Sequence, residues 1–338
     1  MVHVKTVRWK QMKKSKKIIL SMLLVVSLMI LMGCGIINGS AVYKVKIVTT
    51  QFPQYQFVKS IISDNQQLNN KFEVSLLVPP GADSHSFDLR VNDLIEIKNS
   101  NLFLYTSDEI EKWVKKLDIN KYTRVIDLSE GIEMLEVDEE EHEHHHESHT
   151  HEFDPHYWLY PLNAIKMVEK IRDVMIELVE DTFCQNQIME NASSCINELQ
   201  KVDQDIRKVV NNATTKKIYF GSPFSFYYWT HYYELEYVLT YATCSVEVDP
   251  SMTTIIDVIN EMKEENIKVI YIKELLSDSV AEMISEATGA EIVLLHSCHN
   301  VSKTDYDNNK TYIEIMNDNV KALAKGLNVD YEKAVGGQ

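Results

Sequence analysis

The stretch MENASSCINELQKVDQDIRKVV, from Met189 to Val210, decides how the rest of this chain can be arranged. Its apolar residues recur every three or four positions, as they do along one face of a helix. They are Ala192, Cys195, Ile196, Leu199, Val202, Ile206, Val209 and Val210. A helix over this stretch would be about 33 Å long, at about 1.5 Å per residue. We expect it to form a spine between two lobes; the alternative is one long surface helix on a single domain.

Strands and helices alternate on both sides of this helix. The predicted strands are Val45–Thr49, Phe72–Val78, Leu102–Tyr105, Val125–Leu128, Lys217–Phe220, Val269–Ile272 and Ile292–Leu295. The predicted helices are Val91–Lys98, Glu109–Leu117, Ala164–Val179, Thr253–Glu264, Ser279–Thr288 and Tyr312–Leu327. This alternation predicts an α/β fold with parallel-type sheets covered by helices. We place one lobe at residues 44–185, the long linker helix at 186–212 and the second lobe at 213–338.

The first residues form a different kind of sequence from the rest. All charges before Cys34 are basic, and an apolar run from Ile18 to Met32 follows them. The run ends in Leu31-Met32-Gly33-Cys34, which resembles a bacterial lipobox. Residues 1–33 are therefore predicted to be a signal peptide, with Cys34 as the lipidated residue. An uncleaved membrane anchor is the alternative, and either interpretation places the rest of the chain outside the membrane.

Charge and cysteine content limit the partners. The formal net charge of −16 argues against a nucleic-acid partner, which would need a basic face. Four cysteines follow Cys34, and an even number in an exported chain permits two disulfides. They are Cys184, Cys195, Cys244 and Cys298. A bond between Cys184 and Cys195 would require a turn between them. Cys244 and Cys298 could alternatively act as thiolate ligands.

Histidines are concentrated in one acidic segment. Residues Glu136 to Glu152 read EVDEEEHEHHHESHTHE, which holds half of the chain's 12 histidines. The segment has no apolar face, so we predict a mobile loop. Imidazole suits Zn²⁺, Cu²⁺ and Ni²⁺, and we predict an auxiliary metal-binding loop. Its histidines are His142, His144, His145, His146, His149 and His151. The alternative is a solvated charge run.

Three other histidines lie beside turn or strand-end signals. His85 follows the turn in PPGADSHSFD, His156 lies in DPHYWLYP, and His296 lies in VLLHSCHN with His299 three residues later. Ligands of open α/β sheets bind at the carboxyl ends of strands. These separated segments are therefore expected to meet in one metal site.

At these residues the chain resembles the zinc/manganese solute-binding lipoproteins of bacterial ABC importers. The lipobox, the segment from Pro79 to His85, the acidic histidine-rich insert and Asp154-Pro155-His156 with Trp158-Leu159 carry the resemblance. Asp249-Pro250-Ser251 and Thr288-Gly289-Ala290 add to it. The family implies two α/β lobes joined by a rigid helix, with a metal buried between them.

The resemblance also implies a ligand set. His85 and His156 match the two ligands of the first lobe, and His296 falls where the family usually has Asp. Imidazole there suits zinc better than manganese. No ligand occupies the family's third position, near Gly221 to Phe226, so Glu274 is predicted to supply a carboxylate. Water or Cys298 would complete the site.

We therefore predict an extracytoplasmic receptor, lipid-anchored to the bacterial membrane, that captures Zn²⁺ and delivers it to an ABC permease. We expect a monomer and no enzyme, because no His-Glu-x-x-His pair or other compact zinc-enzyme motif occurs. Release would follow docking on the permease, through movement of loops in the second lobe. The alternatives are a manganese or nickel receptor of the same type, an extracellular zinc-dependent hydrolase, or a second role as an adhesin.

Overall fold

The computed structural model describes residues 44–82, 87–136, 153–241 and 249–336, which belong to one compact unit. Cys34, His85, Cys244 and the six histidines of the acidic segment lie outside these residues. Within the described ranges, no helix combines the length and the apolar character needed to cross a membrane.

The first sheet has four parallel strands in the order β2-β1-β3-β4. They are β1 (Val45–Thr49), β2 (Phe72–Leu76), β3 (Leu102–Tyr105) and β4 (Arg124–Asp127). In the register, Val45 lies opposite Phe72, and Leu102 lies opposite Arg124. Helices α2 (Phe52–Ile62) and α3 (Gln66–Lys71) connect β1 to β2, and α4 (Val91–Lys98) connects β2 to β3.

The second sheet repeats this order as β6-β5-β7-β8, again with parallel pairs. Its strands are β5 (Lys217–Phe220), β6 (Glu236–Leu239), β7 (Val269–Ile272) and β8 (Glu291–Leu294). They are connected by α7 (Tyr227–Tyr233), α8 (Met252–Glu264) and α9 (Ser279–Thr288). Gly289 ends α9 in the left-handed conformation, with φ of +75°, as the sequence predicts. The predicted α/β fold with two parallel sheets is confirmed.

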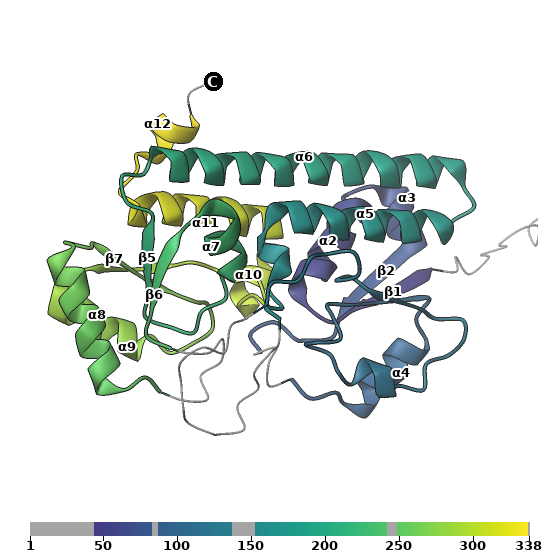
Figure 1. The fold of residues 1–338 in the computed structure, drawn as a ribbon. Coiled ribbons are helices and arrows are strands. Elements are labelled where there is room, and N and C mark those ends of the chain that lie inside the picture. Colours follow the sequence, from purple (N-terminus) through teal and green to yellow (C-terminus); the bar gives the residue numbers. More distant parts are fainter. Residues whose placement is uncertain (1–43, 83–86, 137–152, 242–248, 337–338) are drawn as a thin grey trace, which may run out of the picture. The chain divides into compact units, whose positions relative to one another are not determined.

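A long helix serves both sheets. Helix α6 (Thr182–Asn212) has 31 residues, so it is about 46 Å long. It begins earlier than the predicted Met189 because the Asp181 side chain accepts a hydrogen bond from Phe183 N and caps its first turn. In Figure 1 it runs beside α5 (Pro161–Glu177) and α11 (Tyr312–Gly326), and it also contacts α2 and α12 (Tyr331–Val335).

The position of α6 excludes one disulfide. Cys184 and Cys195 both lie within this helix and are free thiols. They lie eleven positions apart, which is about 16 Å along the helix axis and far beyond the reach of a disulfide. The turn that such a disulfide would require does not exist, because one continuous helix contains both residues.

Three apolar clusters arrange the layers. The largest combines buried residues of α2, α5, α6 and α11 with residues from one face of both sheets. A second cluster joins the other face of the second sheet to α8 and α9, and a third includes Ile97 of α4 and Phe103 of β3. Each sheet is therefore covered on both faces, as parallel sheets require.

The predicted helix from Glu109 to Leu117 is wrong. Only a 3₁₀ turn over Val114–Lys116 forms there. The Glu111 side chain is buried and accepts hydrogen bonds from Thr50 Oγ1 (2.7 Å), Thr106 Oγ1 (2.9 Å) and Ser107 N (3.0 Å). These tertiary bonds hold the segment against the ends of β1 and β3, and they override its helical periodicity.

Candidate metal centre

His156 lies in the segment that follows the acidic insert. It is fully buried and directly precedes the 3₁₀ turn Tyr157–Leu159. Its Nδ1 forms a short hydrogen bond with Asp154 Oδ1, and its backbone N–H donates to the same oxygen at 3.2 Å. An ionised carboxylate can only accept, so Nδ1 carries the proton and Nε2 carries the lone pair. This carboxylate–imidazole pair has the form that orients histidine ligands at metal sites.

His299 is the partner of His156. The two ring centroids lie 4.5 Å apart, with an interplanar angle of 85°. His299 also packs against Trp158, whose ring centroid is 5.0 Å away. Its Nδ1 lies 2.8 Å from Ser297 Oγ, so a metal would be bound through Nε2. The structure thus places two buried imidazoles, each held at Nδ1, against one another.

The segment that carries His299 is held from several directions. Trp158 Nε1 donates to the Ser297 carbonyl at 2.9 Å, and Tyr312 Oη donates to the Trp158 carbonyl at 2.5 Å. Phe52 N, at the start of α2, donates to the His299 carbonyl at 3.4 Å. His299 follows the second sheet in sequence, yet these bonds reach elements that accompany the first sheet.

His296 and Glu274 lie together, but their polar atoms form hydrogen bonds with neighbouring protein groups. His296 Nδ1 accepts a hydrogen bond from Cys298 N at 2.9 Å, which places the proton of a neutral ring on Nε2. Asn319 Oδ1 accepts from His296 N at 2.7 Å, and Asn319 Nδ2 donates to the His296 carbonyl at 2.8 Å. Glu274 Oε2 is 3.6 Å from His296 Nδ1 and accepts from Ser297 N at 2.7 Å.

The segment that precedes His85 lies close to the segment that carries His299. Asn300, the next residue after His299, donates from Nδ2 to the carbonyls of Pro79 (2.7 Å) and Ala82 (2.8 Å). Gly81 N donates to the Val301 carbonyl at 2.8 Å. Ala82 is the last described residue before His85, which itself lies outside the described residues.

Within the stretch from Gly221 to Phe226, where the resemblance implies a third ligand, Gly221 has no room for a side chain. A Cβ atom at Gly221 would lie 2.8 Å from the Cβ of Ala281. Ser222 is buried, and its Oγ accepts a hydrogen bond from Lys273 N at 2.8 Å. Considering only the described residues, no group of three or more His, Cys, Asp or Glu side chains is arranged to hold a metal ion.

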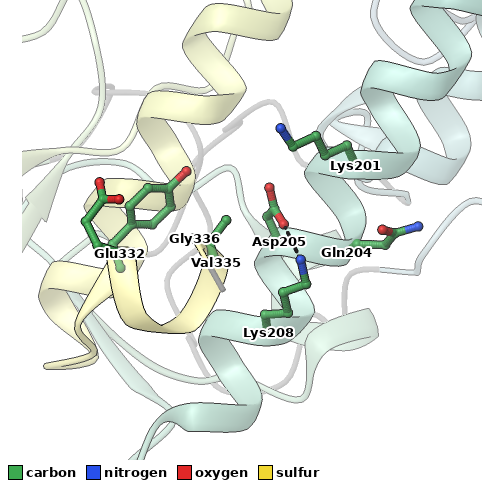
Figure 2. A pocket seen from close by; sticks show the side chains of 8 residues that line it. Lys201, Gln204, Asp205, Lys208, Glu332, Val335 and Gly336 are labelled. Atoms are coloured by element: carbon green, nitrogen blue, oxygen red, sulfur yellow. Dashed lines mark hydrogen bonds and ion pairs between the residues drawn. The ribbon is translucent and has the colours of Figure 1, made fainter. Parts of the chain in front are cut away.

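A cavity of about 400 Å³ lies elsewhere, between α6 and α12 (Figure 2). Lys201, Asp205, Lys208 and Tyr331 are among its lining residues, and Lys208 Nζ pairs with Asp205 Oδ1 at 3.0 Å. The lining has neither histidine nor cysteine, so its chemistry does not suit a transition metal.

Two residues of this centre were missed in the sequence. His299 was noted only as a neighbour of His296, because the end of the strand favoured the earlier histidine. The left-handed backbone of Cys298, with φ of +58°, changes the chain direction between them, and no sequence signal marks it. Asp154 did have a signal, since an Asp two residues before a histidine can bond both its backbone and its ring.

Comparison with known proteins places the chain in a family. Residues 47–326 match the model of ZnuA, described as zinc-uptake complex component A periplasmic. The chain is 32% identical to the "High-affinity zinc uptake system protein ZnuA" of Bacillus subtilis, over 84% of this chain and 88% of that protein. It is 29% identical to the "Zinc-binding lipoprotein AdcA" of Streptococcus pneumoniae over 86% of this chain, and it spans only 58% of that relative's length.

A solved structure shows the same fold. The Zn(II)-bound ZnuA-like domain of Streptococcus pneumoniae AdcA superposes with a TM-score of 0.69 at 27% identity, covering 84% of this chain and 99% of that domain. The match to the family model, over residues 47–326, extends over both sheets and α6. The chain therefore belongs to the family of zinc-uptake complex component A periplasmic proteins.

Proposed function

We propose that this protein is an extracytoplasmic receptor that captures Zn²⁺ and delivers it to the permease of an ABC importer. The observation that carries the proposal is the pair of buried imidazoles, His156 and His299, each of which is hydrogen-bonded at Nδ1. The chain also belongs to a family of zinc-uptake proteins. Because the family to which the chain belongs consists of solute-binding receptors, the protein is a receptor and not an enzyme.

The proposed ligands are His85, His156 and His299. His85 lies three positions after Ala82, and an extended chain covers about 10 Å over three positions. The hydrogen bonds from Asn300 to Pro79 and Ala82 therefore support a position for His85 within reach of His299. Three imidazoles favour Zn²⁺ over Mn²⁺, which prefers oxygen ligands. His299 replaces His296 in this set because His296 Nδ1 accepts a hydrogen bond from the Cys298 backbone N–H, which places the ring proton of His296 on Nε2.

The proposal also includes a lipid anchor, a monomeric state and a role for the histidine-rich insert. Cys34 would carry the lipid anchor, and the receptor would act as a monomer. The six histidines from His142 to His151 would form an auxiliary loop that gathers zinc without belonging to the tight site.

The ends of the acidic insert allow a clean test. Glu136 and Phe153 form an isolated antiparallel bridge, and Asp154 N donates to the Leu135 carbonyl at 2.7 Å. Residues 137–152 can therefore be replaced by a two-residue Asn-Gly turn, which suits such a closure. We expect the purified deletion variant to bind one Zn²⁺ as tightly as the parent, measured by metal analysis and by competition with a chromogenic chelator.

Two outcomes separate the alternatives. Retention of one tight zinc in the deletion variant supports the ordered site and leaves the insert an auxiliary role. Loss of tight binding with the insert, in a variant that still folds cooperatively, contradicts the ordered site and makes the protein a histidine-tract metal buffer.

A further inference from the structure

We propose that Glu274 is a positioning residue that acts through Ser297 to fix the tautomer and the orientation of His299. The inference rests on the proposed function, in which His299 binds zinc through Nε2. Glu274 would then serve the metal without touching it, whereas the sequence pointed to it as a ligand.

Glu274 binds one residue with both of its oxygens. Oε1 lies 2.5 Å from Ser297 Oγ, and Oε2 lies 2.7 Å from Ser297 N. The Glu274 side chain is 7% exposed, and burial of a carboxylate is costly unless it is hydrogen-bonded. These two bonds use both oxygens and account for the position of this carboxylate at the end of β7.

Hydrogen-bond chemistry determines which atom donates in each of the hydrogen bonds that connect Glu274, Ser297 and His299. An ionised carboxylate has no hydrogen to give, so the Ser297 hydroxyl donates to Glu274 Oε1. Ser297 Oγ then offers only a lone pair to His299 Nδ1, 2.8 Å away. His299 must carry its proton on Nδ1, which leaves the lone pair on Nε2 for a metal.

The topology explains why these residues meet. Strands β7 and β8 are parallel neighbours, so the residues after their carboxyl ends lie side by side. Glu274 follows β7, and Ser297 follows β8. On the other side, Trp158 Nε1 donates to the Ser297 carbonyl, so Ser297 is held between the two lobes. The same task that Asp154 performs directly on His156 is performed on His299 through a serine.

The test compares three variants and one control variant of the purified, metal-free protein. Ser297→Ala keeps the carboxylate and removes the hydroxyl link, and Ser297→Thr retains a hydroxyl. Glu274→Gln keeps the shape, but its amide can donate to Ser297 Oγ and so release the hydroxyl hydrogen for His299. Glu286→Gln removes the same charge from an exposed site on α9 and is the matched control.

Two readouts are needed. Long-range ¹H–¹⁵N spectra of the imidazoles report which nitrogen of His299 carries the proton, with His156 as an internal reference. We expect Ser297→Ala and Glu274→Gln to populate the Nε2–H form of His299 and to weaken zinc binding roughly ten- to hundredfold. Ser297→Thr and Glu286→Gln should keep the parental tautomer and affinity.

Different results would contradict the positioning role of Glu274 and the proposed ligand set. An unchanged His299 tautomer in both Ser297→Ala and Glu274→Gln overturns the positioning role, whatever happens to affinity. Unchanged zinc affinity in Ser297→Ala overturns it as well, provided that His299→Asn does weaken binding. If His299→Asn itself retains full affinity, it is the proposed ligand set that fails.

Discussion

At the residue scale, two histidines three positions apart have different environments. His296 follows β8 and is built into the loop, since its Nδ1 accepts the Cys298 amide and its backbone is bonded twice to Asn319. His299 lies against His156 and Trp158. The difference arises from hydrogen-bond direction: an imidazole nitrogen that accepts a backbone N–H has no lone pair left there for a metal.

This difference predicts opposite results for one matched substitution. His299→Asn removes Nε2 and should weaken zinc binding by more than the roughly 10- to 100-fold that an outer hydrogen-bond partner typically costs. His296→Asn retains an acceptor near the position of Nδ1 and should change the affinity less than about tenfold. Competition titration measures both, with thermal unfolding as the control for folding. A larger loss in His296→Asn would restore His296 as the ligand.

At the element scale, the loops that follow β1 and β3 are joined by one buried carboxylate. Glu111 accepts hydrogen bonds from Thr50, Thr106 and Ser107. Burial raises the pKa of Glu111 above its ordinary value of 4.5, although these hydrogen bonds lower it in part. The charged form is therefore less favourable in the folded protein than in the unfolded chain.

The raised pKa of Glu111 predicts a pH-dependent stability. A group with a raised folded pKa contributes stability that is fully present below its unfolded pKa and is lost as pH rises through the folded value. Glu111→Gln is neutral throughout, so its free energy of unfolding relative to the parent should improve from about pH 4 to about pH 8. Urea unfolding of the metal-free proteins at both pH values measures this difference. A relative stability that stays constant or falls with pH contradicts the assignment; Glu286→Gln is the exposed control.

At the scale of the whole molecule, α6 joins the two halves through one apolar core. The largest buried cluster contains residues from one face of both sheets together with α2, α5, α6 and α11. The bonds of the His299 segment add polar links, because Gly81 N donates to the Val301 carbonyl and Trp158 Nε1 donates to the Ser297 carbonyl. His156 and His299 are thus linked across the molecule, and the predicted release of zinc through movement of loops stays a prediction.

A shared core predicts a single unfolding transition. Leu199 is fully buried in α6, and Leu199→Ala should lower the free energy of unfolding by about 2–5 kcal/mol. The exposed neighbour Gln200→Ala should change it by less than about 0.5 kcal/mol. Circular dichroism and tryptophan fluorescence should give coincident urea transitions in all three proteins. Two separate transitions in Leu199→Ala would show that the halves unfold independently.

Local patterns were sufficient for most of the framework. Periodicity of two or of three to four residues gave β1, β3, β5, β7, α4 and α9 at their observed bounds, and it gave α6 apart from its first turns. It failed for Glu109–Leu117, where a buried carboxylate bonded to distant threonines overrides helical propensity. It also missed α2 and β6, whose short or continuous apolar runs have no period that separates helix from strand.

From the sequence alone we predicted an α/β chain with a long central helix, histidines near strand ends and an acidic histidine-rich insert. Which histidines meet, and which ring nitrogen of each is hydrogen-bonded, became clear from the folded structure. His156 and His299 are 143 positions apart in sequence, and their contact depends on strand order, on the backbone turn at Cys298 and on the hydrogen bonds of Asp154, Ser297 and Glu274. Ligand type is a property of single residues, whereas ligand geometry and tautomer are properties of the neighbours that folding brings together.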